Sequence, residues 1–226
     1  MELIGVTAHS YNYKIKAAVK KGIHVVPIED AAVLMKSVDV IVDCTPKGVG
    51  SENKEMYVHH GIKAIFQGGE KPEVGKGFVA QCNYDDAVGE DFIRVVSCNT
   101  TGLCRTLHAI NQKWNVDKVH ATMIRRAADP WDIYHGPVNA LVPHLVVPSH
   151  HGPDVRTIIP DMNIFTTSVS VPTTLMHMHS IAVDLNTEGA VLNSQNEVAG
   201  IEEVIDLFQN TTRVRIVHNS DGIRST

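Results

Sequence analysis

The chain has 226 residues, of which 43% are apolar and 20% charged, with 20 Lys and Arg against 25 Asp and Glu. This composition excludes a disordered chain, a collagen and a coiled coil, and the formal charge of −5 argues against a broad basic face for nucleic acid. No apolar run reaches the roughly 18–20 residues of a membrane span, and the start at Met1–Ile4 has no signal-like basic segment. We therefore expect a cytoplasmic protein that binds neither nucleic acid nor membranes.

Short apolar runs alternate with short helical stretches over the first 70 or so residues. Strands that alternate with helices favour an α/β fold with a parallel sheet. The predicted strands are Glu2–Thr7, Ile23–Pro27, Val38–Cys44 and Lys63–Gln67, and the predicted helices are Tyr13–Lys21 and Ala31–Ser37.

The pattern changes near residue 94, where longer strands begin to alternate with loops rich in Pro, Gly and His. This half is typical of a mostly antiparallel sheet, so we expect one domain over residues 1–96 and a second over 97–226. The predicted strands are Phe92–Val96, Val119–Arg125, Asn163–Pro172, Leu175–Leu185 and Arg213–His218, and the predicted helices are Leu103–Lys113 and Glu202–Asn210.

The segment Ser97–Gly102 is the strongest candidate for covalent chemistry, because Cys98 stands where a predicted strand ends and a helix begins. The N-terminus of a helix carries about half a positive charge and unpaired N–H groups. Such an environment stabilises a thiolate and makes it nucleophilic. A buried cysteine in a tight turn is the alternative interpretation, and the two remain open at this point. The four cysteines of the chain form no C-x-x-C pair, which favours free thiols in a reducing compartment.

Two of the 13 histidines lie two positions apart, at His177 and His179. Side chains at i and i+2 of a strand face the same side, so these imidazoles are candidate general bases or metal ligands. A zinc site needs three or four ligands at set spacings, and no such spacing is found, so we expect no metal. One histidine acting as the base for Cys98 is the better functional interpretation.

Two further polar segments are candidate anion sites. Ser149–Asp154 is a predicted loop between apolar segments, and Arg125 and Arg126 end a predicted strand. Neighbouring arginines on a strand point to opposite faces, so one of them reaches a given site. Arginine binds phosphate with a fork of donors, although a solvated salt bridge is the alternative for each. A reactive cysteine, a histidine base and such anion binders suit a phosphorylated carbonyl substrate.

Four motifs in this order resemble the archaeal-type (type II) glyceraldehyde-3-phosphate dehydrogenases: SCNTTGLCRTL, MIRRAADP, PSHHGPDV and VPTTLMHMH. The stretches FQGGEK and ENK and the segment Phe208–Val214 fit as well, so the resemblance runs, with gaps, over nearly the whole chain. It implies an incomplete Rossmann-type parallel sheet followed by a mostly antiparallel catalytic domain. It also implies a homotetramer that uses NAD or NADP.

The resemblance also implies the reaction and the residue roles. Glyceraldehyde 3-phosphate would be oxidised to 1,3-bisphosphoglycerate, through a cysteine thioester that inorganic phosphate cleaves, as in glycolysis or gluconeogenesis. Cys98 would be the nucleophile and His177 the base. The other assignments are Ser97 and Asn99 beside the aldehyde, His151 and Gly152 at a phosphate position, and Gly68, Gly69 and Arg126 against the nicotinamide nucleotide.

The chain departs from this family at both ends. Family members begin with a strand and a glycine loop upstream of Met1 and continue beyond Thr226, so the chain resembles a copy truncated at both ends. Without a G-x-G-x-x-G loop to hold the pyrophosphate, we expect weak nucleotide binding. No acidic residue in Thr7–Ser10 would exclude NADP. The alternative functions are an inactive fragment or binding module, and a related semialdehyde dehydrogenase.

Overall fold

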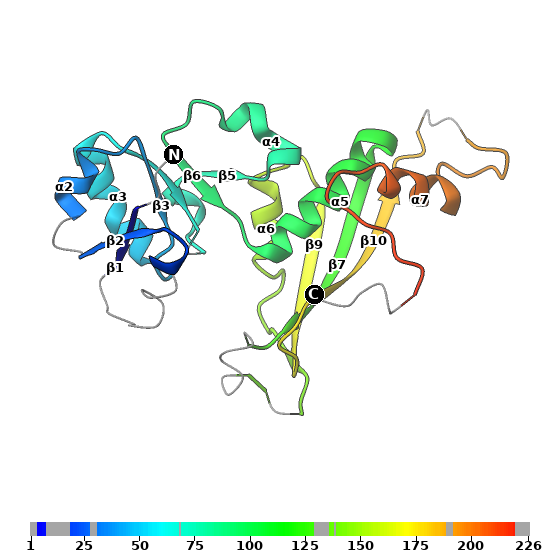
Figure 1. Ribbon diagram of the computed structural model, residues 1–226. Coiled ribbons are helices and arrows are strands. Elements are labelled where there is room, and N and C mark those ends of the chain that lie inside the picture. Colours follow the sequence, from blue (N-terminus) through cyan, green and yellow to red (C-terminus); the bar gives the residue numbers. More distant parts are fainter. Residues whose placement is uncertain are drawn as a thin grey trace. The chain divides into compact units, whose positions relative to one another are not determined.

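The computed structural model describes residues 4–7, 19–27, 31–67, 69–128, 136–137, 139–188 and 192–219 (Figure 1). The chain forms two compact units. Unit 1 comprises Met1–Gly75 and Asp91–Ile93, and unit 2 comprises Lys76–Glu90 and Arg94–Thr226. The chain changes unit after Gly75, after Glu90 and, within strand β6 (Phe92–Val95), after Ile93. In the described part of the chain, no helix is long and apolar enough to cross a membrane.

Unit 1 contains the parallel strands that its sequence predicted. Strands paired in parallel need a crossover between them, and α3 (Val49–His60) is the crossover from β3 to β4. The predicted helix over Tyr13–Lys21 lies largely outside the described residues. The parallel pairs are β1 (Ile4–Thr7) with β2 (His24–Pro27) and β3 (Val40–Asp43) with β4 (Lys63–Phe66), and α2 (Ala31–Met35) precedes β3.

The core of unit 1 packs α3 against β4. Tyr57 of α3 is buried, and its ring centroid lies 6.1 Å from that of Phe66. Asp43, at the carboxyl end of β3, accepts hydrogen bonds from the Tyr57 hydroxyl (2.8 Å) and from the Asn53 amide (3.0 Å). Burial raises the pKa of Asp43, but hydrogen bonds from Thr45, Asn53 and Tyr57 outweigh it and lower that pKa overall. The end of β3 is therefore tied to α3 by a charged group.

Unit 2 is built around a mixed four-stranded sheet of order β10-β7-β9-β8. The outer pairs β10–β7 and β8–β9 are antiparallel, which confirms the mostly antiparallel expectation, whereas the central pair β7–β9 is parallel. Figure 1 shows α5 and α6 lying against this sheet. The elements are β7 (Val116–Arg126), β8 (Val142–Pro143), β9 (Ile164–Val171), β10 (His177–Leu185), α5 (Cys98–Trp114) and α6 (His151–Arg156).

The core of unit 2 lies between α5, α6 and β7. Leu103 and Leu107 of α5 are fully buried, as are Val119 and Met123 of β7 and Val155 of α6. Burying a side chain of this size stabilises a fold by about 1.5–3 kcal/mol. The first turn of α5 is therefore held against the sheet by apolar packing.

Three expectations from the sequence need correction. The helix expected from Leu103 begins at Cys98, because Ser97 caps it. The predicted loop Ser149–Asp154 contains the six-residue helix α6. The predicted strand Arg213–His218 is wrong: it forms turns and coil, no described strand pairs with it, and Arg213 has a φ of 64°.

The remaining described elements are 3₁₀ helix η2 (Pro72–Val74), β5 (Lys76–Phe78), α4 (Ala80–Ala87) and α7 (Ile201–Gln209). Strand β5 belongs to a four-stranded sheet of order β3-β4-β6-β5.

Candidate active site

Cys98 lies at the junction of a strand and a helix, as its sequence position predicted. It is the exposed first residue of the 17-residue helix α5. Ser97 has extended backbone angles, and its Oγ accepts a hydrogen bond from the Thr100 N–H at 3.2 Å. A serine in this position satisfies one of the N–H groups left unpaired at the start of a helix. The cap therefore fixes the start of α5 and presents the Cys98 thiol at its positive end.

The other three thiols differ from Cys98 in exposure or surroundings. Cys104 is fully buried, and burial raises its pKa well above the usual range. Burial also raises the pKa of Cys82 to about 11. Cys44 is exposed in unit 1, with its Sγ 3.7 Å from Oε1 of Gln67. Cys98 is therefore the exposed thiol of unit 2.

A buried ionic network supports the first turn of α5. The Thr100 hydroxyl donates to Oδ2 of Asp154 at 2.9 Å, and the Thr100 and Ser97 hydroxyls lie 3.0 Å apart. Nη1 of Arg94 lies 2.7 Å from Oδ1 of Asp154, with the two side chains 4% and 11% exposed. The other terminal nitrogen of Arg94 donates to the Thr157 hydroxyl at 3.0 Å. These contacts join the helix that carries Cys98 to α6.

The two histidines of β10 use different ring nitrogens. Nδ1 of His177 accepts a hydrogen bond from the backbone N–H of Arg126 at 3.1 Å. Nε2 of His179 lies 2.8 Å from Oδ1 of Asn99, which is 3% exposed and follows Cys98 in α5. Burial lowers the pKa of His179. The structure therefore connects His179 to the neighbour of Cys98, and His177 lies two positions earlier on the same face of the strand, as their spacing predicted.

His151 and Gly152 are buried and bonded to protein groups. His151 is 1% exposed, and its Nδ1 lies 3.1 Å from Oγ of Ser149. The N–H of Gly152 donates to Oγ1 of Thr166 at 3.0 Å, and a Cβ at Gly152 would lie 3.0 Å from that oxygen. An anion at this place therefore finds the Gly152 N–H already engaged.

The His151 imidazole is held neutral by its surroundings. Burial lowers its pKa to about 3, and nearby positive charge acts in the same direction. The groups responsible for that second effect are His150, Arg125, His179 and His177. Of these groups, Arg125 and the two β10 histidines belong to the antiparallel pair β7–β10, in which Arg125 lies opposite His177 and Met123 opposite His179.

Arg125 is one of the two arginines that the sequence offered as anion binders, although the family resemblance assigned a role to Arg126 alone. It lies directly opposite His177 in the antiparallel pair β7–β10, so the two side chains share a face of the sheet. Its Nε is buried and, within the described ranges, has no hydrogen-bond partner. The alternation of buried and less buried residues along β7 could have pointed to Arg125, because Ala121 and Met123 face the core and Arg125 lies on the same face of the strand. Arg126, the expected nucleotide contact, is half-buried and provides the N–H that holds His177.

The glycines expected at the nucleotide lie in unit 1. Gly68 falls outside the described residues. Gly69 has a φ of 76°, and a Cβ added there would meet no atom of the described residues within 4 Å, so its backbone is open to a ligand. Ligands of parallel sheets bind at the carboxyl ends of the strands, and Gly69 lies just beyond the carboxyl end of β4. The nucleotide contact expected of Gly69 stays a prediction.

The start of α3 does not offer a second anion site, because the protein's own carboxylate occupies it. Oε1 of Glu70 accepts hydrogen bonds from the N–H groups of Gly48 (2.8 Å) and Gly50 (3.1 Å). Its Oε2 accepts from the Ser51 hydroxyl at 2.7 Å. These are the groups that a phosphate at a helix N-terminus uses.

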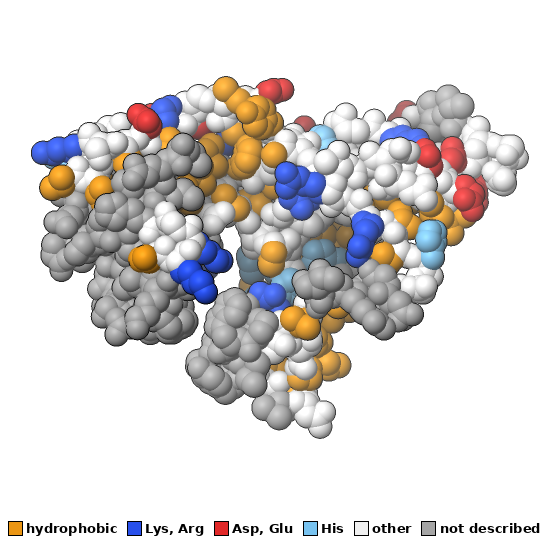
Figure 2. Space-filling view, in the orientation of Figure 1, with side chains coloured by type: hydrophobic (Ala, Val, Ile, Leu, Met, Phe, Trp, Pro, Cys, Tyr) orange, Lys and Arg blue, Asp and Glu red, His pale blue; other side chains and the backbone are white. Residues whose placement is uncertain are grey.

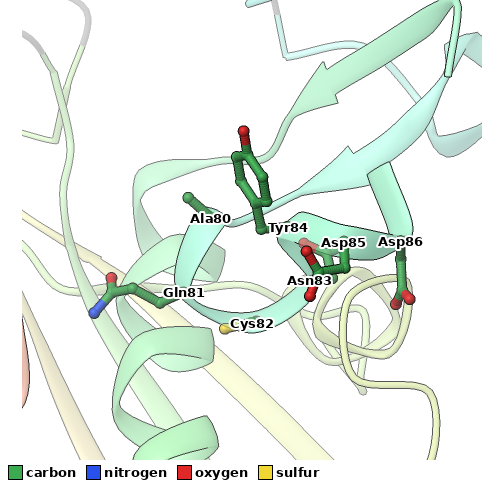
Figure 3. Close-up of a pocket in the computed structure, with 7 residues that line it drawn as sticks. All are labelled: Ala80, Gln81, Cys82, Asn83, Tyr84, Asp85 and Asp86. Atoms are coloured by element: carbon green, nitrogen blue, oxygen red, sulfur yellow. The ribbon is translucent and has the colours of Figure 1, made fainter. Parts of the chain in front are cut away.

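A pocket lies over α4 (Figure 3). Asn83 has non-helical angles that kink α4. Its Oδ1 accepts from the Val79 N–H at 3.0 Å, and its Nδ2 donates to the Gly77 carbonyl at 2.8 Å. The carboxamide of this residue, which also lines the pocket, is therefore engaged at both ends. Residues Ala80–Asp86 line the pocket.

Comparison with known proteins places this site in a family. The profile of the glyceraldehyde 3-phosphate dehydrogenase C-terminal domain matches residues 97–218. The glyceraldehyde-3-phosphate dehydrogenase of Pyrococcus furiosus is 49% identical over 243 aligned residues, which cover 100% of this chain and 69% of that protein. The enzyme of Thermococcus kodakarensis is 48% identical with the same coverage. That of Thermococcus sibiricus is 55% identical over 85% of this chain and 54% of its own length. The chain therefore belongs to the glyceraldehyde-3-phosphate dehydrogenase family.

Proposed function

We propose that the chain oxidises glyceraldehyde 3-phosphate to 1,3-bisphosphoglycerate through a thioester on Cys98, with a nicotinamide nucleotide and inorganic phosphate. The observation that carries the proposal is the exposed Cys98 thiol on the first residue of α5, beside the buried Asn99. Membership of the glyceraldehyde-3-phosphate dehydrogenase family supports the substrate and the reaction class.

The first step is addition of the Cys98 thiolate to the aldehyde carbon. A C–S bond forms and the carbonyl oxygen becomes an alkoxide, so the negative charge moves from sulfur to oxygen and no proton is needed. The N–H groups and the positive end of α5 stabilise the charge in both places. Ser97 and Asn99 are assigned to the sides of the aldehyde, with the Asn99 amide hydrogens as donors to the oxygen.

His177 is assigned to the hydrogen bond with that oxygen. Because Nδ1 accepts from the Arg126 N–H, a neutral His177 ring carries its hydrogen on Nε2. Nε2 then donates to the alkoxide as it forms. The base role expected from the sequence requires Nε2 to be free of hydrogen when it takes a proton, so the contact with Arg126 supports the donor role.

The adduct must then lose hydride and be cleaved. When bound, the nicotinamide nucleotide supplies the hydride acceptor that converts the adduct into a thioester. Inorganic phosphate attacks the thioester carbon, the C–S bond breaks, and Cys98 leaves as a thiolate. The half-buried Arg125, opposite His177, supplies positive charge for a phosphoryl group. His151 and Gly152 remain assigned to the same phosphate position, but not through the Gly152 N–H, which Thr166 already holds.

The finer assignments follow the family. We assign NAD or NADP as the nucleotide, with contacts from Gly68, Gly69 and Arg126. We assign residues 1–96 to nucleotide binding and 97–226 to catalysis, in a cytoplasmic homotetramer. Exposed apolar side chains near β8 support association with further copies, because large apolar patches mark contact surfaces. They include Leu141, Leu145, Val146 and Val147.

A dehydrogenase assay with matched cysteine variants tests the proposal. The chain is mixed with glyceraldehyde 3-phosphate, phosphate and either NAD or NADP, and reduced nucleotide is followed by absorbance. We expect Cys98→Ser to abolish turnover and Cys44→Ser, which changes the other exposed thiol, to leave it within about twofold. Equal loss in both variants, or turnover by Cys98→Ser, would contradict the assignment of the nucleophile.

A further inference from the structure

The contact between β10 and α5 has a fixed donor and a fixed acceptor. The Oδ1 of Asn99 lies 2.8 Å from Nε2 of His179. A carboxamide oxygen only accepts, so His179 donates from Nε2 and its neutral ring keeps a lone pair on Nδ1. His177 does the reverse: its bond inside the protein uses Nδ1, and that nitrogen accepts. The two histidines therefore perform different tasks although they share a face.

Asn99 is placed where the orientation of its carboxamide matters. It is 3% exposed and adjoins Cys98 in the first turn of α5. The oxygen and nitrogen ends of a carboxamide have nearly the same shape but opposite hydrogen-bonding character. A neighbouring group that only donates a hydrogen bond selects one of the two carboxamide orientations, because it binds the oxygen and repels the NH₂ group. With its oxygen held by His179, the Asn99 side chain keeps both Nδ2 hydrogens for other acceptors.

The His179 ring is also held from the helix side. A Cβ on Gly102 would lie 3.3 Å from Cε1 and 3.7 Å from Nδ1 of His179, so the ring packs directly on the backbone of α5. The backbone of His179 pairs with the fully buried Met123 in β7. Burial lowers the pKa of the imidazole, and the bond to Asn99 requires a ring hydrogen on Nε2. Strand and helix together fix the position of the donor.

We propose that His179 is a positioning residue, which holds the Asn99 carboxamide so that its NH₂ group serves the oxygen of an acyl or aldehyde group bound at Cys98. The proposal rests on the proposed function in taking Cys98 as the nucleophile. It assigns to His179 no contact with substrate and no proton transfer. The rate of any reaction that places negative charge on an oxygen at Cys98 then depends on His179, whereas simple alkylation of the sulfur does not.

Two thiol reactions on the same chain separate these effects and need no nucleotide. Acylation by p-nitrophenyl acetate passes through an oxyanion and releases nitrophenolate, which is followed by absorbance. Alkylation of Cys98 by iodoacetamide, followed by peptide mapping, has no oxyanion. Loss of a whole oxyanion donor costs about 10²–10³-fold in rate, and a donor that is misplaced rather than removed costs less. We expect His179→Ala to lower the acylation rate about tenfold or more and to leave alkylation within about twofold.

Conservative replacements at position 179 provide the rescue test. The side-chain nitrogen of Gln lies near the place of Nε2 of His, whereas that of Asn lies near Nδ1. We therefore expect His179→Gln to restore the ratio of acylation to alkylation to within about threefold of the unchanged chain, and His179→Asn to fail. Met178→Ala is the control, because Met178 neighbours His179 on β10 and is 62% exposed; it should leave the ratio unchanged.

Gly102→Ala tests the same contact without changing a polar group. Alanine is a better helix former than glycine, so the melting temperature should not fall, while the added methyl group crowds the His179 ring. We expect acylation to fall severalfold with alkylation unchanged. Acylation and alkylation that fall together in His179→Ala, or equal rates for the Gln and Asn variants, would overturn the inference. An unchanged chain that does not acylate at Cys98 would instead overturn the proposed nucleophile.

Discussion

The chemistry of individual side chains in unit 2 is set by how each is enclosed. His151 is buried beside Ser149, and burial together with nearby positive groups lowers its pKa to about 3. Arg125 is only half-buried, and its Nε has no hydrogen-bond partner in the part of the chain that is described. Because this guanidinium lies opposite His177 and its Nε is left free to donate by the described residues, a phosphoryl group is the ligand that we assign to it.

Replacing Arg125 by Gln should therefore weaken recognition of the substrate phosphate. A hydrogen bond to a charged group contributes about 1.5–3 kcal/mol, so we expect KM for glyceraldehyde 3-phosphate to rise about 10- to 100-fold. Turnover of unphosphorylated glyceraldehyde should change less than about twofold. The measurement is steady-state kinetics with both aldehydes.

Arg105→Gln is the control for this prediction. Arg105 lies on α5, and its Nε is likewise buried without a hydrogen-bond partner among the described residues. It has no assigned contact with substrate, so its replacement should leave the preference between the two aldehydes unchanged. The same loss of preference in both variants, or an unchanged preference in Arg125→Gln, would remove Arg125 from the phosphate site.

At the scale of elements, the sequence predicted the helices and strands that have a clear local pattern of apolar residues. It failed where the outcome depends on contacts with distant parts of the chain. The strand before Cys98 and helix α5 were found, because an apolar run ends at Ser97 and a helical pattern follows. Helix α3 was missed, because only Gly50 and Tyr57 are buried along it and its apolar periodicity is weak. Arg213–His218 alternates like a strand, but the described part of the sheet offers it no partner.

The ion pair between Arg94 and Asp154 is the contact that most clearly joins elements. Breaking a buried pair by removing one charge leaves the other uncompensated, at a cost of about 3–5 kcal/mol. We expect Asp154→Asn to lower the free energy of unfolding of unit 2 by about this amount in urea denaturation.

The exposed pair of Lys63 and Asp91 is the matched control for that prediction. Its nitrogen and oxygen lie 3.0 Å apart, with side chains 51% and 68% exposed. Such surface pairs contribute about 0–1 kcal/mol, so Asp91→Asn should have little effect. If Asp154→Asn were no more destabilising than Asp91→Asn, the network would not hold α5 to α6.

At the scale of the molecule, the pairing of distant strands was beyond the sequence. The mostly antiparallel character of unit 2 was predicted, but the parallel pair β7–β9 was not, because nothing local to either strand records a partner about 45 positions away. Likewise, the His179–Asn99 bond joins residues 80 positions apart. The motifs named the residues of the site, and only the fold shows which of them touch.

The exposed apolar side chains near β8 lead to a prediction about assembly. Leu145 is 88% exposed and Val146 is 66% exposed, and Figure 2 shows apolar side chains at the end of unit 2 farthest from α4. We expect the chain to be oligomeric by light scattering, and Leu145→Asp with Val146→Asp to lower its mass. Val88→Asp, at a 65% exposed position after α4, should leave the mass unchanged. A monomeric unchanged chain would contradict the prediction.

The central claim is that Cys98 carries the acyl group, and the reverse reaction tests it most directly. The chain is mixed with 1,3-bisphosphoglycerate in the absence of nucleotide, so that acyl transfer releases phosphate and leaves 3-phosphoglyceroyl thioester on the protein. Intact mass and peptide mapping then locate the adduct. The account predicts one acyl group, on the peptide that contains Cys98, and none in Cys98→Ser. An adduct on Cys44, or no thioester on the unchanged chain, would contradict it.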